Sequence, residues 1–352
     1  MFWPYNKAMT DSAKPLGEFD LIERFFKNRA NQELKNYPQI LLGIGDDCAL
    51  IGAEKSFNSN SLKDLAISTD MLVEGRHFLP DANPYLLGHK CLAVNLSDLA
   101  AMGARPLGFT LAIAMPEVKA SWLEAFSNGL FDLANQHQCP LIGGDTTAGP
   151  LTISITVFGS VSGGEALARH KAQAGDDIWV SHQVGDARLA LGALRHEWPL
   201  SAEEFNAVSG RMHAPTPRVD LGQKLLGIAN AAIDISDGLL GDLSHILRQS
   251  KVSAEVLIDE VPGSDVLKSK SLELQRLCKL SGGDDYELCF TAPPEKTAAI
   301  NGLSKELGFA LTKIGKVTSS STQLITLIDG DGHPLPPNLS DQYLQSFDHF
   351  KS

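Results

Sequence analysis

The sequence lacks the features that mark secreted, zinc-thiolate and membrane-spanning proteins. Its 352 residues include five cysteines, an odd number with no C-x-x-C spacing, so neither a disulfide framework nor a zinc site is expected. Free thiols in a reducing cytoplasm are expected instead. The apolar stretch 86–115 is interrupted by Asn95, Asp98 and Arg105, which argues against a spanning helix. No basic segment followed by an apolar core opens the chain, so we expect no signal peptide and predict a cytoplasmic protein with no membrane contact.

Positive charge is also scarce. The chain has 30 Lys and Arg residues against 42 Asp and Glu residues, and its formal net charge is −12. Because nucleic-acid affinity depends on Lys and Arg contacts to phosphates, this balance argues against a nucleic-acid partner. It does not exclude a nucleotide substrate, because bound cations can reverse the sign of the local charge.

Three common catalytic loops are absent. No segment matches the phosphate-binding G-x-x-x-x-G-K-[ST] loop or the G-x-S-x-G loop of serine hydrolases. A dinucleotide fingerprint begins at Gly43-Ile44-Gly45 but has Cys48 where the third glycine is required. A P-loop enzyme, a serine hydrolase and a Rossmann oxidoreductase are therefore disfavoured.

The apolar pattern predicts two domains in which strands and helices are mixed, so the expected fold class is α/β or α+β. A chain of this length exceeds one ordinary core. Pro84 suits the first turn of a helix that Asn83 caps. The Gly/Ser-rich stretch 160–164 is the best candidate for a domain boundary. This division predicts a loose leader at 1–16, an N-terminal domain at 17–163 and a C-terminal domain at 164–352.

Acidic turns are what the sequence has in abundance. Six apolar runs end in a loop that sets Gly or Ser beside Asp, and buried strands deliver such loops to the rim of a sheet, where sites form. So many carboxylates can lie together only if hard divalent cations neutralise them, and bound Mg²⁺ usually completes its shell with substrate phosphates. The sequence therefore predicts metal-dependent phosphate chemistry. The loops are 45–47, 68–70, 95–98, 143–147, 234–238 and 282–285.

Two of these loops are more specific than the others. Asp234 and Asp237 stand three residues apart before a helix predicted from Gly238, a spacing that would put both carboxylates on one face. Free N–H groups and the Ser236 hydroxyl would then be available to a phosphate. The loop 143–147 combines glycines, which let a phosphate approach the backbone, with a carboxylate and two hydroxyls. For any one loop taken alone, ordinary turn and capping chemistry explains the residues equally well.

Two further residues have alternative interpretations. Arg169, with His170 and Lys171, could reach a nucleotide phosphate, although a solvated surface is the more common explanation for a lone basic cluster. His77 could contact a substrate phosphate or serve a structural role.

The order of these loops and their residue sequences resemble those of the thiamine-monophosphate kinase family, which belongs to the PurM-like (aminoimidazole ribonucleotide synthetase) superfamily. The similarity runs from about residue 17 to the C-terminus. It implies two α/β domains, an ATP site without a P-loop, and homodimers paired through the N-terminal domains. The segments that carry it are 42–49, 68–78, 93–104, 143–147, 232–239 and 281–288.

The resemblance also implies a set of site residues. ATP would contact Gly144, Asp145, Arg169 and Ser236. Thiamine monophosphate would contact His77, Asp284 and a C-terminal aromatic ring, either Tyr343 or Phe347. The family usually has Glu at the position of Asp284, so this contact would be longer or bridged by water. Mg²⁺ ions would be held by Asp47, Ser68, Thr69, Asp70, Asp98, Asp145, Asp234 and Asp237.

The implied activity is phosphoryl transfer from ATP to thiamine monophosphate, which yields ADP and thiamine diphosphate. The acceptor is a phosphate monoester with a second pKa of about 6, so it is mostly ionised at neutral pH and needs no general base. Metal ions would cancel the repulsion between two polyanions and align a direct in-line transfer, with Asp234, Asp237 and Asp145 at its centre. Two alternatives are another ATP-using member of the superfamily and a non-catalytic nucleotide-binding module. The matches around His77 and at 95–104, and the lack of a Cys/Sec-Gly-Cys-x-x-Lys motif, argue against the first. The presence of all six acidic turns argues against the second.

Overall fold

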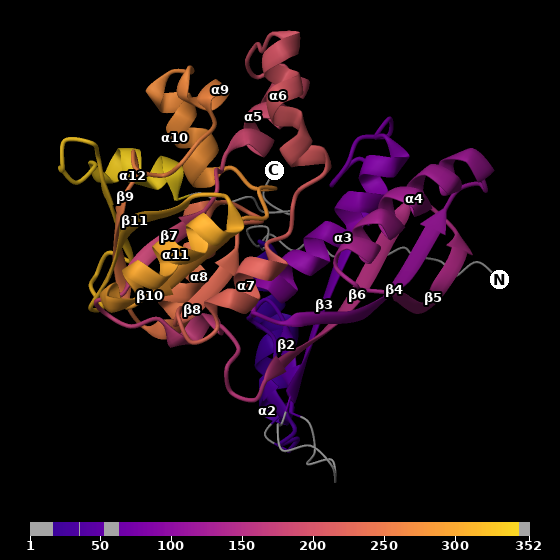
Figure 1. Cartoon of the computed structure of the whole chain (residues 1–352), viewed down its shortest axis with the longest axis horizontal. Coiled ribbons are helices and arrows are strands. Elements are labelled where there is room, and N and C mark those ends of the chain that lie inside the picture. The colour runs from indigo at the N-terminus through magenta and orange to yellow at the C-terminus, as the bar shows by residue number, and fades with distance from the viewer. Residues whose placement is uncertain (1–16, 35, 53–62, 345–352) are drawn as a thin grey trace, which may run out of the picture.

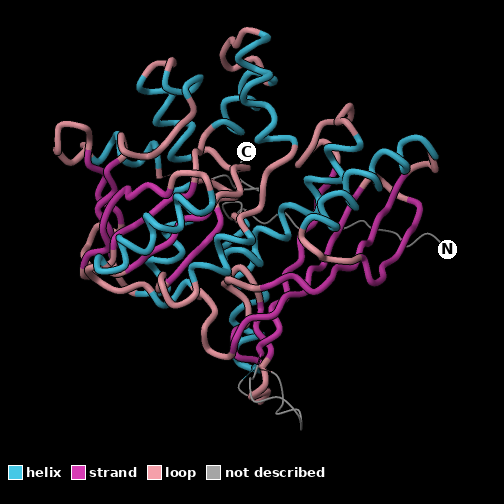
Figure 2. The backbone as a smooth tube through the Cα atoms, viewed as in Figure 1, coloured by secondary structure: helices cyan, strands magenta, loops and turns pink. Residues whose placement is uncertain are grey.

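The computed structural model describes residues 17–34, 36–52 and 63–344 and arranges them in two lobes, each built on one six-stranded sheet (Figure 1). Figure 2 shows helices packed over the strands of each lobe. The predicted leader 1–16 and Phe347 lie outside the described residues. Within the described ranges, no helix combines the length and the apolar character needed to cross a bilayer.

The N-terminal lobe contains a mainly antiparallel sheet with one covered face. Its order is β1 (Ile40–Leu42), β2 (Ala49–Ile51), β3 (Lys63–Val73), β6 (Thr152–Ser162), β4 (Arg105–Met115) and β5 (Leu141–Ala148). In β6, Ile153, Ile155 and Val157 are buried and most residues between them are half-buried, which is the period-two pattern of such a sheet. Helices α3 (Pro84–Ala101) and α4 (Ala120–Gln136) lie over the covered face (Figure 1). The segments α1 (Glu18–Ile22), the π-helix η1 (Glu23–Lys27) and α2 (Asn28–Leu34) precede the sheet.

The C-terminal lobe contains a sheet that is covered on both faces. Its order is β12 (Ile325–Ile328), β9 (Ser253–Leu257), β11 (Leu311–Thr318), β7 (Asp177–Ser181), β10 (Leu288–Ala292) and β8 (Ala231–Asp234). Ile178 and Cys289 pack with α8 (Leu239–Ser250) on one face. On the other face Trp179 and Phe290 stack with ring centroids 6.4 Å apart and join the core of the first lobe. The other helices of this lobe are η2 (Arg169–Lys171), α5 (Asp186–Leu194), α6 (Ala202–His213), α7 (Val219–Leu225), α9 (Asp265–Lys268), α10 (Leu272–Ser281), η3 (Pro294–Lys296), α11 (Thr297–Leu307) and α12 (Pro337–Tyr343).

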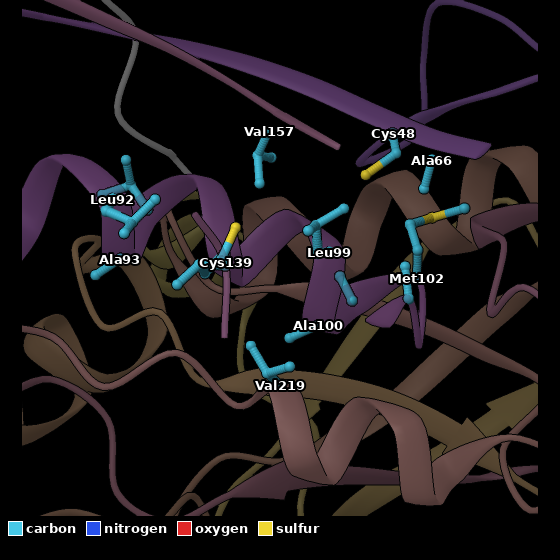
Figure 3. Packing of buried hydrophobic residues seen from close by; sticks show 14 of the residues in the cluster. Cys48, Ala66, Leu92, Ala93, Leu99, Ala100, Met102, Cys139, Val157 and Val219 are labelled. Atoms are coloured by element: carbon cyan, nitrogen blue, oxygen red, sulfur yellow. The ribbon is translucent and has the colours of Figure 1, made fainter. Parts of the chain in front are cut away.

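Helix α3 joins the two lobes. The Asn83 side chain accepts two backbone N–H groups of the first turn and Pro84 occupies the first position, as the sequence predicts. Most of the helix is buried, which is typical of a helix that packs between layers. Figure 3 shows Val157 of β6 on one side of this helix and Val219 of α7 on the other. The helix therefore delivers its last turn to the space between the two sheets.

The segment 143–147 is not the turn that the sequence predicts. It lies inside β5, the outermost strand, where it pairs in parallel with β4. Gly144 has a φ of 152°, and a Cβ atom there would lie 1.9 Å from the carbonyl oxygen of Leu111. The glycine is therefore required for close contact between two strands.

Candidate active site

Three carboxylates from three separate elements converge between the lobes. Asp47 precedes β2, Asp98 lies in the last turn of α3, and Asp234 ends β8. One carboxylate oxygen from each of the three lies within 4.8 Å of the other two, and Asp47 and Asp234 are only 6% and 4% exposed. The fold therefore assembles an acidic cluster that no single segment of the sequence contains.

Burial makes this acidic cluster electrostatically unfavourable unless a cation joins it. Desolvation raises the pKa of Asp98 and the pKa of Asp234 well above the usual range, and the charges of neighbouring aspartates raise both further. Burial also raises the pKa of Asp70 to about 6. Mg²⁺ prefers carboxylate and hydroxyl oxygens, so the donor set fits the ion that the sequence predicts. A bound divalent cation would favour the ionised carboxylates and reverse these shifts.

Strand β3 contributes to the acidic cluster through alternate residues. Ser68 donates a hydrogen bond to Asp98, and the charge of Asp70 acts on Asp98 as well. The Thr69 hydroxyl lies 2.9 Å from that of Thr156, because successive side chains of a strand point to opposite faces. The structure thus brings Ser68 and Asp70 to the cluster and directs the Thr69 side chain to the other face of the sheet.

Arg169 neutralises one edge of the acidic cluster. Its guanidinium donates to both oxygens of Asp47, at 3.1 Å from Nε and 2.5 Å from a terminal nitrogen. Its backbone N–H donates to Asp46 at 3.0 Å. Burial and the charge of Asp47 raise the pKa of Asp46 to about 7, although Arg169 opposes this rise. A nucleotide phosphate at this place would compete with Asp47 for the guanidinium.

The loop after β8 is held by Asp242, a residue that sequence reasoning missed. Asp242 is 4% exposed in the first turn of α8, and its Oδ2 accepts the backbone N–H groups of Ser236, Asp237 and Gly238 at 3.1, 3.2 and 3.1 Å. An acidic residue in the first turn of a helix is its only sequence signal, and ordinary helix-dipole chemistry explains that signal too. Asp242 therefore sets the shape of the loop that carries Asp237.

Two expectations for this loop are wrong in detail. Because the N–H groups of 236–238 are bonded to Asp242, they are not free for a phosphate. Helix α8 begins at Leu239, so Asp234 lies at a strand end and Asp237 in a loop, not on one helix face. Burial, followed by the charges of Glu18 and Asp284, raises the pKa of Asp237 to about 7.

Asp284 has a partner that sequence reasoning also missed. Lys90 of α3, whose side chain is 7% exposed, places Nζ 2.5 Å from Asp284 Oδ2 and donates to the Met212 carbonyl oxygen at 2.9 Å. Asp284 adopts a left-handed φ of 71°, and its N–H donates to the Ser236 carbonyl oxygen at 2.8 Å. A lysine beside the apolar residues 91–94 of this helix is the sequence signal that could have identified Lys90. The ion pair fixes Asp284 beside the loop after β8.

Gly144 and Asp145 lie far from the acidic cluster within one chain. In the sheet register Asp70 faces Ile155, Ile155 faces Leu111, and Leu111 faces Gly144. Three strand spacings of about 4.8 Å, roughly 14 Å in all, therefore separate Asp70 from Gly144. Asp145 is exposed on β5. The structure does not bring Asp145 to the three converging carboxylates.

The two remaining predicted residues differ in their surroundings. His77 is half-buried in the turn after β3, and its Nδ1 accepts the N–H of Val73 at 3.0 Å, which sets the orientation of the ring. Tyr343 is 5% exposed and packs in the core of the C-terminal sheet. A ring buried in this way has no face on which a substrate can stack, so its position does not support the prediction for Tyr343.

Comparison with known proteins identifies the family of this chain. The family model described as AIR synthase related protein, N-terminal domain, matches residues 45–161, and the corresponding C-terminal domain matches residues 173–326. The thiamine-monophosphate kinase of Haemophilus influenzae is 42% identical over 337 residues, which cover 96% of this chain and 98% of that protein. That of Escherichia coli strain K12 is 43% identical over 337 residues, with 95% and 98% covered. This chain belongs to the thiamine-monophosphate kinase family. The resemblance seen in the sequence is confirmed, and the chain is an enzyme of the kinase class.

Solved structures of the thiamine-monophosphate kinase family share the fold. The enzyme from Stenotrophomonas maltophilia superimposes with a TM-score of 0.73 at 43% identity, covering 92% of this chain and 99% of that one. AaThiL complexed with AMPPCP and TMP superimposes with a TM-score of 0.76 at 28% identity, covering 97% and 100%. The predicted PurM-like α/β architecture is therefore confirmed.

Proposed function

We propose that this kinase transfers the γ-phosphate of ATP to thiamine monophosphate, with thiamine diphosphate and ADP as products, and that it acts in the cytoplasm with several Mg²⁺ ions. The observation that carries the proposal is the convergence of Asp47, Asp98 and Asp234 from both lobes onto one buried point. The complex of a family member with an ATP analogue and TMP supports the choice of substrates.

In the proposed reaction, acidic residues of this chain position metal ions near the two substrate phosphates. Asp47, Asp98 and Asp234 would hold Mg²⁺, with Ser68 and Asp70 beside them. When bound, the ions supply charge that offsets the repulsion between donor and acceptor phosphates. No side chain has to remove a proton, because the second pKa of a phosphate monoester is about 6. Direct in-line transfer is the simplest reaction that such a site supports.

The remaining residues would bind and orient the two substrates. Arg169 would exchange Asp47 for a nucleotide phosphate, because a guanidinium forms strong paired hydrogen bonds with either anion. The Ser236 hydroxyl would be a second donor to the nucleotide. His77 and Asp284 would contact thiamine monophosphate, with Lys90 holding Asp284 in position.

A second copy of the chain would complete the site as a homodimer. On the sheet face opposite α3 and α4, Met71 is 57% exposed, and Ile142 on β5 is 63% exposed. Exposed apolar residues on one open face are typical of protein interfaces. Because a two-fold dimer uses the same surface on both copies, pairing through this face would set Asp145 of one copy beside β3 of the other. This placement would explain why Asp145 lies far from the acidic cluster of its own chain.

The test is turnover of ATP with Mg²⁺ in the presence and absence of thiamine monophosphate, with thiamine diphosphate measured by fluorescence after oxidation. Equal amounts of ADP and thiamine diphosphate are expected. Asp234→Asn should abolish the product, whereas the exposed helix residue Asp220, changed to Asn, should leave it intact. ATP binding without product would contradict the proposed acceptor. Retention of configuration at a chiral γ-phosphate would contradict direct transfer.

A further inference from the structure

A cavity lies beside α6, apart from the residues assigned above. Its volume is about 460 Å³, which is within the range of small-molecule sites. The lining includes two arginines and no acidic residue. We call this cavity the arginine pocket; it is lined by His182, Ala207, Gly210, Arg211, Ala214, Thr216, Arg218 and Phe309.

One carboxylate behind the arginine pocket serves both arginines. Glu287 is fully buried and accepts a hydrogen bond from Arg218 Nε at 2.6 Å and another from Ser181 Oγ at 2.5 Å. Arg211 reaches the same carboxylate only at 3.5 Å. The charge of Arg211 also acts on Asp186, a buried carboxyl group that accepts a hydrogen bond from Ser264 at 2.6 Å. Among the residues that the structure describes, Glu287 is therefore the only carboxylate within ion-pair distance of Arg211, and Arg211 shares it with Arg218.

The other contact of Arg211 is a weak one for a cation. A terminal guanidinium nitrogen meets Nε2 of His182, and burial together with the charges of Arg211 and Arg218 lowers the pKa of His182 to about 4. The imidazole is neutral at pH 7, and a guanidinium bonds more strongly to an anion than to a neutral nitrogen. The Arg211 side chain is 24% exposed, so a ligand in the cavity can reach it.

The walls of the arginine pocket are held in place before any ligand arrives. The guanidinium carbon of Arg218 lies 4.5 Å from the ring centroid of Phe309, a cation–π distance, while its nitrogens bond Glu287. Thr216 is exposed on the loop between α6 and α7 and adds a hydroxyl donor. Preformed donors reduce the entropy lost when a ligand binds.

We propose that the arginine pocket binds a small oxyanion, either inorganic phosphate or the phosphate group of a monoester. Arginine is suited to this ligand because its planar donors match two phosphate oxygens. Arg211 would turn from His182 to the anion, with Thr216 as a second donor. Arg218 would keep Glu287 and contribute its charge.

A matched pair of variants at Gly210 tests the proposal. Gly210 lines the pocket on α6, and a Cβ atom there would meet no other atom within 4 Å, so a side chain is accommodated. Loss of a helical glycine also favours folding. In Gly210→Glu a carboxylate would take the place of the anion beside Arg211. Gly210→Gln has the same length without the charge.

Binding of inorganic phosphate is measured by titration calorimetry in EDTA, where the acidic cluster has no metal and repels anions. Wild type, Gly210→Gln and the exposed control Arg195→Gln should bind alike. Gly210→Glu and Arg211→Gln should weaken binding by about ten-fold or more, as expected for loss of a charge-assisted contact. Absence of saturable binding to wild type, or equal binding by Gly210→Glu and Gly210→Gln, would overturn the proposal. Repeating the titration with glycerol phosphate distinguishes the two sources: tighter binding than phosphate identifies a monoester site, and weaker binding a site for the free ion.

Discussion

Replacing Asp242 tests whether one buried carboxyl group shapes the loop of the active site. Its Oδ2 accepts three consecutive backbone N–H groups at 3.1–3.2 Å, and the residue is 4% exposed. In Asp242→Ala all three donors lose their acceptor. In Asp242→Asn the amide oxygen can accept the same three bonds. The two substitutions therefore separate the role of the acceptor from the role of the charge.

The magnitude follows from the burial of the three donors. A buried donor left without a partner costs roughly 1–3 kcal/mol. Gly238 is buried, so its N–H bears this cost in full, whereas Ser236 and Asp237 are half-buried and water can replace part of the lost bonds. We expect Asp242→Ala to lower the free energy of unfolding by about 2–4 kcal/mol, and Asp242→Asn by less than about 1 kcal/mol.

The assays are urea unfolding in EDTA and steady-state kinetics with Mg²⁺. Misplacing a catalytic loop by about 1 Å can cost on the order of 100-fold, so kcat should fall by about that factor in Asp242→Ala. Asp220→Ala is the control, because Asp220 is an exposed acid in the first turn of α7. Wild-type stability and kcat in Asp242→Ala would refute this reasoning. If Asp242→Asn is as damaging as Asp242→Ala, the charge and not the acceptor is what matters.

Three other outcomes are expected from the site. Arg169→Lys keeps the charge but loses the bidentate fork, so the KM for ATP should rise by about ten-fold; an unchanged KM would place the nucleotide elsewhere. Mixing Asp145→Asn protein with Asp234→Asn protein should restore about a quarter of the wild-type activity, because half of the dimers would be mixed and each would have one intact site; no recovery would contradict a shared site. As pH rises from about 5 to about 7.5, the free energy of unfolding of the metal-free protein, measured by urea titration, should fall. Folded-state pKa values of about 6 for Asp70 and about 7 for Asp237 lie above the ordinary 3.8. The folded chain therefore binds more protons than the unfolded chain in this window, and the stability that these protons contribute is lost as pH rises. With Mg²⁺ added, the free energy of unfolding should no longer fall over this pH range. A stability of the metal-free protein that rises with pH would contradict the raised pKa values of Asp70 and Asp237.

Secondary structure was predictable where a local rule applies. Asn83 and Pro84 mark the start of α3, as the sequence predicts. Helix α6 was not predicted, although Ser201 and Glu204 form a capping box and match its S-x-x-E sequence pattern. Only two residues of α6 are buried, so its apolar pattern is weak.

The candidate site was predictable as a list of residues but not as an arrangement. Asp47, Asp98 and Asp234 stand in recognisable loops, and the structure brings them together. Asp242 and Lys90 escaped notice because their partners are a backbone loop and a residue distant in sequence. The Lys90–Asp284 contact joins residues 194 positions apart and so has no local pattern, and ordinary helix-dipole chemistry also explains an acid in the first turn of α8.

By itself, the sequence determined the family, the two-domain α/β fold and the acidic character of the loops, because these depend on residue types in a fixed order. The tertiary structure decided which carboxylates meet, that the Thr69 hydroxyl faces Thr156 on the other side of the sheet, and that Gly144, next to Asp145, lies roughly 14 Å from Asp70. The physical reason is that strand order and register are set by pairing between distant segments. A strand's own residues specify its alternation but not its neighbours.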